Sequence, residues 1–221
     1  MTELVHCTVT GKVATITLDS PHNRNALSRQ LMRELSGHLE SAGKDPGVRA
    51  VVLTHTGKVF CAGADLSEAG TGSMEQDTAL VTELLRTVVE LPKPVVARVT
   101  GHVRAGGMGI VGACDLAIAS EAATFAFTEV RVGVAPAIIS LTTLDRMRSR
   151  AASRFYLTGE VRQTSPQGSA ETKLLLTAAT RRQLVAHGAE MTALSARLFA
   201  TDEAQEGIHA FLQRRSPSWQ K

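Results

Sequence analysis

The chain has 221 residues, of which 43% are hydrophobic and 20% charged, and its formal net charge is +3. This length allows one sizeable hydrophobic core, or a core with a small appendage. The low charge and the lack of a basic stripe with interleaved aromatic residues argue against nucleic-acid binding. The sequence has no apolar run long enough for a bilayer, no signal-peptide order at its N-terminus and only three scattered cysteines. We therefore expect a cytoplasmic protein with reduced cysteines.

Strands and helices are predicted to alternate in the first half of the chain, which favours an α/β protein with mainly parallel strands. Val13 to Leu18 has the sequence VATITL, an alternation typical of a strand. Ser28 is a candidate N-cap for a helix in which Leu31, Leu35 and Leu39 recur at helical spacing. The other predicted elements are strands at 50–54, 95–99 and 116–119 and helices at 80–91 and 106–113.

Beyond Pro136 the pattern is helical throughout. Helices are predicted at 138–157, 166–179, 182–199 and 202–214. We expect residues 1–157 to form the core and 158–221 a C-terminal helical region. Such helices need an apolar surface to pack on, which predicts an oligomer. Arginines also gather late in the chain, either as solvated helix faces or as local attraction for an anionic small molecule.

The first candidate site motif is the loop FCAGADL at 60–66. Small residues allow a ligand to approach the backbone closely, and a strand-to-helix loop can direct an N–H group at an anion. The same composition suits a simple tight turn, so local composition alone leaves both interpretations open.

The second motif is GHVRAGGMG at 101–109, between a predicted strand and a predicted helix. A helix N-terminus offers unpaired N–H groups and a favourable dipole for negative charge. Gly107, Gly109 and Gly112 also match the G-x-G-x-x-G pattern of dinucleotide-binding proteins. That match is weak, because the next apolar run begins at Leu116 and leaves little room for a crossover helix.

The third motif is FAFTEVRVG at 125–133, which contains Glu129. A lone glutamate in a mixed segment is usually an exposed charge. Here its apolar neighbours favour desolvation, which would raise the pKa of the carboxyl and suit it to proton transfer.

Other chemistries find little support in the sequence. The seven histidines show no metal-binding spacing, and neither a G-x-S-x-G elbow nor a P-loop is present. We expect no metal. Cys61 is interpreted as a small buried residue rather than a nucleophile.

Taken together, these segments resemble the enoyl-CoA hydratase/isomerase family, also called the crotonase family. The resemblance runs nearly end to end, and the order and spacing of its segments carry it. The matching segments are VATITLDSPHNRNALS (13–28), VFCAGADLSE (59–68), LPKPVVARVTGHVRAGGMGIVGACDLAIAS (91–120), FAFTEVRVGVAP (125–136) and EGIHAFLQRRSPSW (206–219).

The resemblance implies a crotonase-like ββα superhelix with a C-terminal helical trimerisation region, in trimers that often pair into hexamers. It also implies an acyl-CoA substrate whose thioester oxygen lies between two backbone N–H groups, on Ala64 and Gly106. These donors would stabilise the enolate-like charge that develops during the reaction. No cofactor is implied beyond the coenzyme A carried by the substrate, and neither nucleic acid nor a membrane is implied as a partner.

The resemblance implies only one of the family's two catalytic glutamates. The second family glutamate matches Glu129, whereas the first matches Gly109. Two glutamates position a water for hydration, and one suffices to move a proton between carbons, as in the family's isomerases. Some bacterial hydratase-like members have glycine here and keep the APAIIS pattern found at 135–140, so Gly109 does not exclude hydration.

Further positions match family contacts to the substrate's coenzyme. Arg24, Ala62, Asp65 and Leu66 match positions along the adenine and pantetheine path, and Gly107 is also carried over as a substrate contact. In the terminal helix, Phe211 and Arg214 match an aromatic and a cationic position. Arg214 would meet a phosphate, or it is an ordinary surface charge.

The sequence departs from the family pattern near Val161 and Arg162. Several family elements are missing there, because the segment after Val161 resembles a point well further on. Either the protein is shortened or a stretch of the natural chain is absent from this sequence. The region between Ala69 and Thr78 is short and polar, which suits a mobile loop beside the acyl pocket.

The leading hypothesis is an enoyl-CoA hydratase that uses Glu129 as its single acid/base. The alternatives are a Δ3,Δ2-enoyl-CoA isomerase and a non-catalytic acyl-CoA-binding member of the fold. The sequence gives neither the acyl chain nor the choice between trimer and hexamer.

Overall fold

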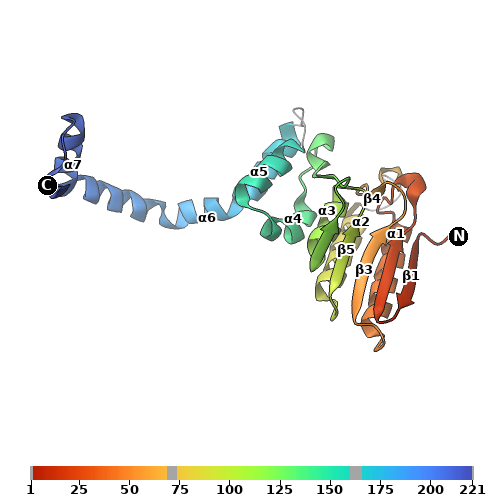
Figure 1. The fold of residues 1–221 in the computed structure, drawn as a ribbon. Coiled ribbons are helices and arrows are strands. Elements are labelled where there is room, and N and C mark those ends of the chain that lie inside the picture. Colours follow the sequence, from red (N-terminus) through yellow and green to blue (C-terminus); the bar gives the residue numbers. More distant parts are fainter. Residues whose placement is uncertain (1, 69–73, 160–165, 221) are drawn as a thin grey trace. The chain divides into compact units, whose positions relative to one another are not determined.

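A computed structural model describes residues 2–68, 74–159 and 166–220 (Figure 1). Within these residues strands and helices alternate along the chain up to residue 126, and only helices follow. The strands are β1 (Val5–Thr10), β2 (Val13–Leu18), β3 (Ala50–His55), β4 (Val59–Cys61), β5 (Val95–Val99), β6 (His102–Arg104), β7 (Leu116–Ala119) and β8 (Phe125–Ala126). The α-helices are α1 (Arg29–Lys44), α2 (Met74–Glu90), α3 (Gly106–Ala113), α4 (Ala137–Thr143), α5 (Ser149–Thr158), α6 (Pro166–Phe199) and α7 (Asp202–Leu212).

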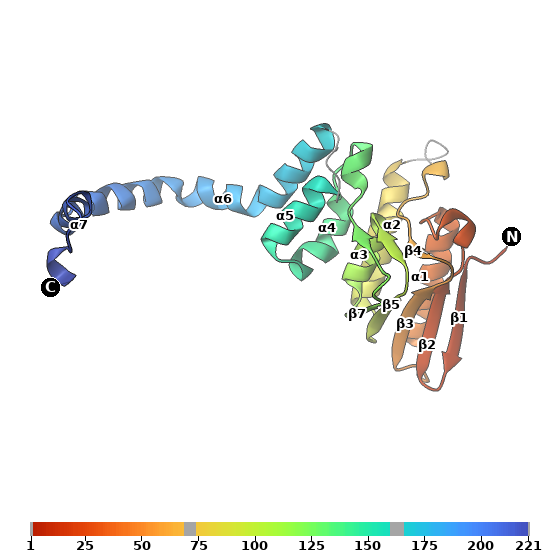
Figure 2. The same ribbon diagram turned by 45° about the horizontal axis from the view of Figure 1, so that its top comes forward.

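Two sheets organise the first part of the chain. Five strands form the larger sheet in the order β1-β2-β3-β5-β7, with β1 antiparallel to β2 and the remaining pairs parallel. Figure 2 shows these strands side by side, with α1 and α2 together on one face. The smaller sheet has the order β4-β6-β8 and is parallel.

A ββα unit repeats three times after α1. In each unit a strand of the larger sheet is followed by a strand of the smaller sheet and then by a helix. The units are β3-β4-α2, β5-β6-α3 and β7-β8-α4. This repeat confirms the α/β class and the ββα superhelix expected from the resemblance.

The core lies between the larger sheet and its helices. On β2, alternate residues from Ala14 to Leu18 are fully buried, as the alternation predicts. Helix α1 begins where Ser28 Oγ accepts a hydrogen bond from Leu31 N at 3.2 Å, an N-cap that satisfies a free helix donor. Its leucines at 31, 35 and 39 are buried against the sheet. The core is therefore aliphatic, in keeping with the 4% aromatic content.

The predicted elements agree well with the structure up to residue 119, with some corrections. Strands β2, β5 and β7 and helix α3 have the predicted bounds. Strands β1, β4, β6 and β8 were not predicted. Strands β4, β6 and β8 have three or fewer residues, too few to show an alternating pattern, and β1 mixes polar and apolar residues. Helix α2 begins at Met74 and not at residue 80, so residues 74–78 of the predicted loop are helical. The remaining residues of that predicted loop, 69–73, lie outside the described residues.

The helical part differs from its prediction in two places. The stretch 138–157 holds two helices, α4 and α5, because a 3-10 turn and an extended Met147 separate them. The helices expected at 166–179 and 182–199 are one continuous helix, α6, since neither Thr180 nor Arg181 between them is a residue that breaks a helix.

The chain divides into two compact units, Met1–Leu175 and Leu176–Lys221, so the division falls inside α6. The expected boundary at 157/158 and the expected missing family segment stay predictions, because residues 160–165 lie outside the described residues. Among the helices that the structure describes, none is long and apolar enough to cross a membrane.

Candidate active site

Three loops meet at one edge of the smaller sheet. Ala64 follows β4, Gly106 follows β6 and Glu129 follows β8, each within three residues of the strand end. Because β4, β6 and β8 are adjacent and parallel, their carboxyl ends lie together, where α/β proteins bind their ligands. The repeated ββα unit thus delivers one candidate group per repeat to the same place.

The loop that carries Ala64 is held on both sides by the segment before α1. Ala62 N donates to Arg24 O at 3.1 Å, and Leu27 N donates to Gly63 O at 2.8 Å. Asp65 N donates to Leu27 O at 3.4 Å. Within the described residues the Ala64 N–H donates to no other group. The neighbouring bonds therefore fix this donor and leave it available to a ligand.

Asn25 holds that segment in turn, a role that the sequence analysis did not find. Its side chain accepts from Ser20 N at 2.7 Å and donates to Thr56 O at 3.2 Å and Val59 O at 2.7 Å. Asn25 is fully buried and has a φ of 53°, a left-handed conformation that asparagine tolerates. The signal in the sequence was Asn25 itself, an amide side chain just before the apolar pair at 26–27.

Gly106 brings the second N–H next to the first. It is the first residue of α3, and its N–H donates to no carbonyl among the described residues. A Cβ added at Gly106 would lie 3.9 Å from Ala64 N and 2.8 Å from Leu27 Cδ1. The two loops are therefore in close contact, and a side chain at this point would have to displace the end of the Leu27 side chain. Ala105, the residue before, has φ 45° and ψ −121°, a strained conformation of the kind found at functional sites.

Glu129 lies in the 3-10 helix η3 (Glu129–Val132), and its Oε2 atom is buried with no hydrogen-bond partner in the described part of the chain. Burial raises the pKa of this carboxyl to about 7, although its own backbone N–H opposes the shift. The Phe127 ring packs on Tyr156 with centroids 4.1 Å apart, and the Tyr156 hydroxyl is hydrogen-bonded to Thr143. The expected desolvation of Glu129 is confirmed by this burial.

The place of the first family glutamate is filled by a hydrophobic side chain. A Cβ added at Gly109 would lie 2.7 Å from Ile139 Cγ2 and 3.3 Å from Leu85 Cδ1. Ile139, on α4, is 3% exposed. A carboxylate at position 109 therefore has no room, and the absence of the first glutamate is accompanied by a packed apolar contact. The resemblance linked Gly109 with the APAIIS segment at 135–140, but only the structure identifies Ile139 as the residue of that segment that packs on Gly109.

A cavity of about 340 Å³ adjoins Ala64. Its walls come from α1, the loop after β4, α2 and the end of η3. The lining residues are Leu27, Met32, Ala64, Asp65, Leu66, Glu68, Asp77, Thr78, Val81, Val132 and Val134. The cavity thus opens beside one donor and is bordered by the segment that follows Glu129.

Four of the predicted coenzyme contacts lie in or beside the loop that follows β4. Asp65 and Leu66 line the cavity, and Ala62 is hydrogen-bonded to the backbone of the exposed Arg24. Asp65 accepts from Ser67 Oγ at 2.6 Å and from Asn23 Nδ2 at 3.0 Å, and the Ser67 bond lowers the pKa of its carboxyl. Their contacts with a coenzyme stay predictions.

Gly107 has a packing role in the structure. A Cβ there would lie 2.8 Å from Cys61 Cβ and 3.0 Å from Cys61 O, so the glycine allows α3 to lie against β4. Gly112 serves in the same way against Thr142 O at 2.7 Å. The glycines of the apparent dinucleotide pattern are thus used for packing, and substrate contact by Gly107 stays a prediction. Cys61 is fully buried, and burial raises the pKa of its thiol to about 12, which confirms its interpretation as a filler.

Phe211 and Arg214 belong to the second unit, whose helices are described separately. Phe211 lies on α7 and is 81% exposed. Arg214 follows α7 with a φ of 52°. Both side chains are accessible in their unit, and their role toward a coenzyme stays a prediction.

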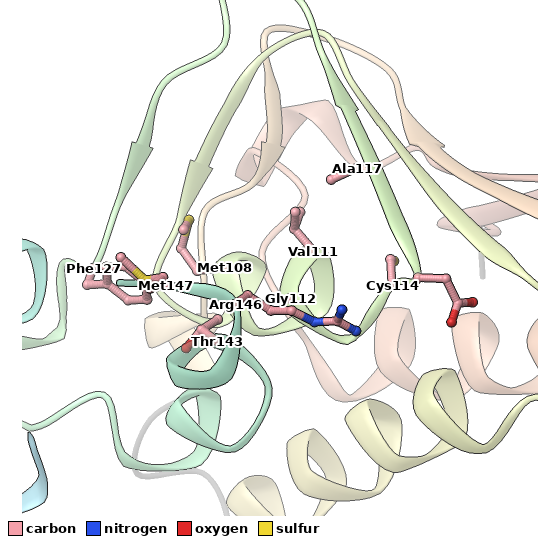
Figure 3. Close-up of a pocket in the computed structure, with 10 residues that line it drawn as sticks. Met108, Val111, Gly112, Cys114, Ala117, Phe127, Thr143, Arg146 and Met147 are labelled. Carbon is pink, nitrogen blue, oxygen red and sulfur yellow. The ribbon is translucent and has the colours of Figure 1, made fainter. Parts of the chain in front are cut away.

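A second cavity, of about 270 Å³, lies between α3 and the segment after α4 (Figure 3). Figure 3 shows Met108 and Val111 reaching toward it from α3, with Thr143, Arg146 and Met147 coming from the segment at the end of α4 and after it. Neither Ala64, Gly106 nor Glu129 lines it. Of these three residues, Ala64 alone lines the cavity of about 340 Å³, which is therefore the better candidate for the substrate.

Comparison with known proteins gives a consistent result. The family model described as enoyl-CoA hydratase/isomerase matches residues 8–168. A Thermus thermophilus protein that is provisionally named an enoyl-CoA hydratase is 34% identical over 245 positions, covering 94% of this chain and 97% of the relative. Since 245 positions exceed the 221 residues here, that relative has positions without a counterpart in this chain. The 2,3-dehydroadipyl-CoA hydratase of Escherichia coli is 28% identical, with coverage of 94% and 95%.

Solved structures agree with the sequence matches. The crystal structure of an enoyl-CoA hydratase from Mycobacterium avium is 44% identical with a TM-score of 0.66, and the match covers 99% of this chain and 100% of that chain. An enoyl-CoA hydratase structure from Mycobacterium smegmatis is 29% identical with a TM-score of 0.68, covering 99% of both chains.

Proposed function

Because the chain belongs to the enoyl-CoA hydratase/isomerase family, we propose that it is an enoyl-CoA hydratase that adds water across a 2-enoyl-CoA thioester. The observation that carries the proposal is the buried, unpaired Oε2 of Glu129 at the same sheet edge as the free N–H groups of Ala64 and Gly106. The family acts on acyl-CoA thioesters, whose carbonyl oxygen is the natural acceptor for two such donors.

In this proposal the donors and the carboxylate divide the reaction between them. Glu129 takes a proton from water while the water oxygen bonds to C3, and the electrons of the double bond move onto the thioester oxygen. Ala64 and Gly106 stabilise that negative charge, and each such donor contributes about 3–4 kcal/mol to transition-state stabilisation. Glu129 then returns the proton to C2. A pKa of about 7 suits a group that must both accept and donate a proton near neutral pH.

The experiment is a direct assay of the purified full chain with crotonyl-CoA and longer 2-enoyl-CoA esters. Hydration removes the conjugation between the double bond and the thioester, so the absorbance of the conjugated thioester should fall. A constant absorbance with every ester, beside an active control hydratase, would exclude hydration.

The second candidate is a Δ3,Δ2-enoyl-CoA isomerase, which the contact between Gly109 and Ile139 favours. With no space for a second carboxylate, Glu129 alone would take a proton from C2 of a 3-enoyl-CoA and return it to C4. Conjugated-thioester absorbance would then rise from a 3-enoyl-CoA, without later decay. A rise followed by decay would instead indicate that the same site isomerises and hydrates.

We also propose that the C-terminal helices assemble the protein as a homotrimer or hexamer. The support is the row of exposed apolar side chains in the second unit, since exposed apolar patches mark interaction surfaces. They are Leu184, Val185, Met191, Leu194, Leu198, Phe199, Ile208, Phe211, Leu212 and Trp219. Sedimentation equilibrium measures the assembly directly, and a monomer at micromolar concentration would contradict it.

A further inference from the structure

The cavity beside Ala64 combines apolar walls with an excess of negative charge. Seven of its lining residues are apolar, and they are Leu27, Met32, Ala64, Leu66, Val81, Val132 and Val134. Three more are carboxylates, Asp65, Glu68 and Asp77. No lysine, arginine or histidine lines it in the part of the chain that the structure describes.

The sequence around the cavity shows the same bias. From Val59 to Leu85 the chain has five acidic residues and no lysine, arginine or histidine. Three of these five acidic residues, Asp65, Glu68 and Asp77, line the cavity.

Arg29 is the nearby cation, and its guanidinium is committed to Asp77. Arg29 Nε and Nη2 donate to the two Asp77 oxygens at 2.6 and 2.7 Å, a bidentate geometry. The Arg29 backbone N–H donates to Glu68 Oε2 at 3.0 Å. The Arg29 bond lowers the pKa of Asp77 and the Ser67 bond lowers that of Asp65, so both carboxyls are ionised at neutral pH. Three carboxylates thus face the cavity against one guanidinium.

These charges decide which part of an acyl-CoA ester fits here. The nucleotide of coenzyme A carries several phosphate charges, and an acidic wall repels them. The acyl group is therefore the part that enters the cavity when the thioester oxygen is bound at Ala64, and on this assignment the lining residues Asp65 and Leu66 contact the acyl group instead of the coenzyme. Within the acyl group, methylenes gain free energy on leaving water. A terminal carboxylate would lose its hydration and meet like charges.

We propose that the cavity beside Ala64 takes an uncharged aliphatic acyl chain and excludes a chain that ends in a carboxylate. The inference rests on the proposed acyl-CoA chemistry of this site and adds the substrate class to it. Asp77 is the specificity-determining residue, because it adds a negative charge and occupies the guanidinium that would otherwise pair with an acyl carboxylate.

The test compares two esters of equal chain length, hexanoyl-CoA and adipyl-CoA, which differ in the group at the end of the acyl chain. Neither has the double bond, so calorimetric titration of the full chain measures binding without turnover. We expect hexanoyl-CoA to bind at least tenfold more tightly than adipyl-CoA. Equal Kd values, or tighter binding of adipyl-CoA, would overturn the inference.

Two variants and a matched control locate the discrimination. Asp77→Asn should narrow the ratio of the two Kd values by about tenfold, because it removes a charge and releases Arg29. Glu68→Gln, which removes a charge and leaves the Arg29–Asp77 pair in place, should narrow the ratio less. Glu83→Gln also breaks a carboxylate–arginine pair on α2, with Arg86 at 2.6 Å, but Glu83 is exposed and does not line the cavity. That control should leave the ratio of the two Kd values unchanged. The inference would be contradicted if Asp77→Asn and Glu68→Gln also left this ratio unchanged.

Binding and catalysis can fail separately in this design. Discrimination between the two esters without hydration of crotonyl-CoA would uphold the substrate class and reject the proposed reaction. Hydration of crotonyl-CoA with equal binding of both esters would uphold the reaction and reject the substrate class.

Discussion

The two sides of the candidate site are built from different kinds of group. On one side, Ala64 and Gly106 offer backbone N–H groups in loops that backbone hydrogen bonds of Ala62, Asp65 and Ala105 hold in place. On the other side, Glu129 is a single side chain with one unpaired oxygen, and Ile139 fills the place of a second carboxylate. In the proposed function, carbonyl polarisation would therefore depend on the backbone, whereas the reaction that follows would depend on very few side chains.

The largest expected effect on activity comes from removing the carboxyl group of Glu129. Glu129→Gln keeps the shape and removes the proton carrier, so kcat should fall by about 10²–10⁴-fold. The Kd for hexanoyl-CoA should change little, because the donors at Ala64 and Gly106 are untouched. Steady-state kinetics and calorimetry measure the two quantities. An unchanged kcat would mean that Glu129 has no chemical role. If the wild type shows no activity at all, a non-catalytic acyl-CoA-binding protein would be the better interpretation.

The backbone donors should be lost when the side chain of Asn25, which supports the Ala64 loop, is removed. Asn25→Ala deletes three hydrogen bonds and leaves buried partners unpaired, each costing about 1–3 kcal/mol. We expect the free energy of unfolding to fall by about 3 kcal/mol or more, with loss of activity. The matched control is Asn23→Ala, because Asn23 lies two residues away, is half-buried and makes two part-buried side-chain bonds, with Ser20 and Asp65. Equal losses in urea denaturation of both variants would contradict a supporting role for Asn25.

A pH series should move stability and activity in opposite directions. The pKa of Glu129 is raised from 4.5 to about 7, so between these values the folded protein binds more protons than the unfolded chain. The free energy of unfolding should therefore fall as pH rises through this window, by up to about 3 kcal/mol at about 1.4 kcal/mol per pKa unit. Activity should rise through the same window, because the carboxylate is the base.

The variant Glu129→Gln isolates this contribution, since glutamine resembles the protonated acid at every pH. Its unfolding free energy, measured by urea denaturation at pH 5 to 8, should lack the decline seen in the wild type. A wild type and a variant with parallel pH profiles would mean that Glu129 ionises in the folded protein as it does in water.

The contact between Gly109 and Ile139 should resist a second carboxylate. Gly109→Glu forces a side chain into a filled space, and overpacking of this kind costs about 1–3 kcal/mol. Hydration should not increase. The control is Gly37→Glu, also in a helix but with open space around the added Cβ, which should be neutral or slightly stabilising. A stable Gly109→Glu variant with faster hydration would show that the site accepts the two-glutamate arrangement.

Much of the fold followed from the sequence, because periodic segments carried it. Alternation in Val13–Leu18 and the leucine spacing after Ser28 gave β2 and α1 their places. The short strands β4, β6 and β8 were not predictable from two or three residues, although they align the three site loops. Their ladder depends on pairing between distant segments, which no local pattern encodes.

Some features of the candidate site could also be predicted from the sequence, whereas others needed the structure. Glycine loops indicated where N–H groups would be offered, and the apolar neighbours of Glu129 indicated its desolvation. The roles of Asn25, Ile139 and Ala105 needed the structure, since each acts through a contact with residues far along the chain or through a backbone angle. A residue that supports or blocks a site carries no signature of its own.

The smallest expected effect lies within the backbone half, at Ala105. Its φ of 45° and ψ of −121° cost about 1–3 kcal/mol for an alanine, and glycine reaches these angles without strain. Glycine also loses more entropy on folding and gives up one methyl contact, so Ala105→Gly should stabilise the protein by about 1 kcal/mol or less. That corresponds to a rise in Tm of about 2–4 °C at most. Ala113→Gly, at the ordinary end of the same helix, should lower Tm instead. If both variants lowered Tm equally, the strain at Ala105 would be absent, and the position of the Gly106 N–H would need another cause.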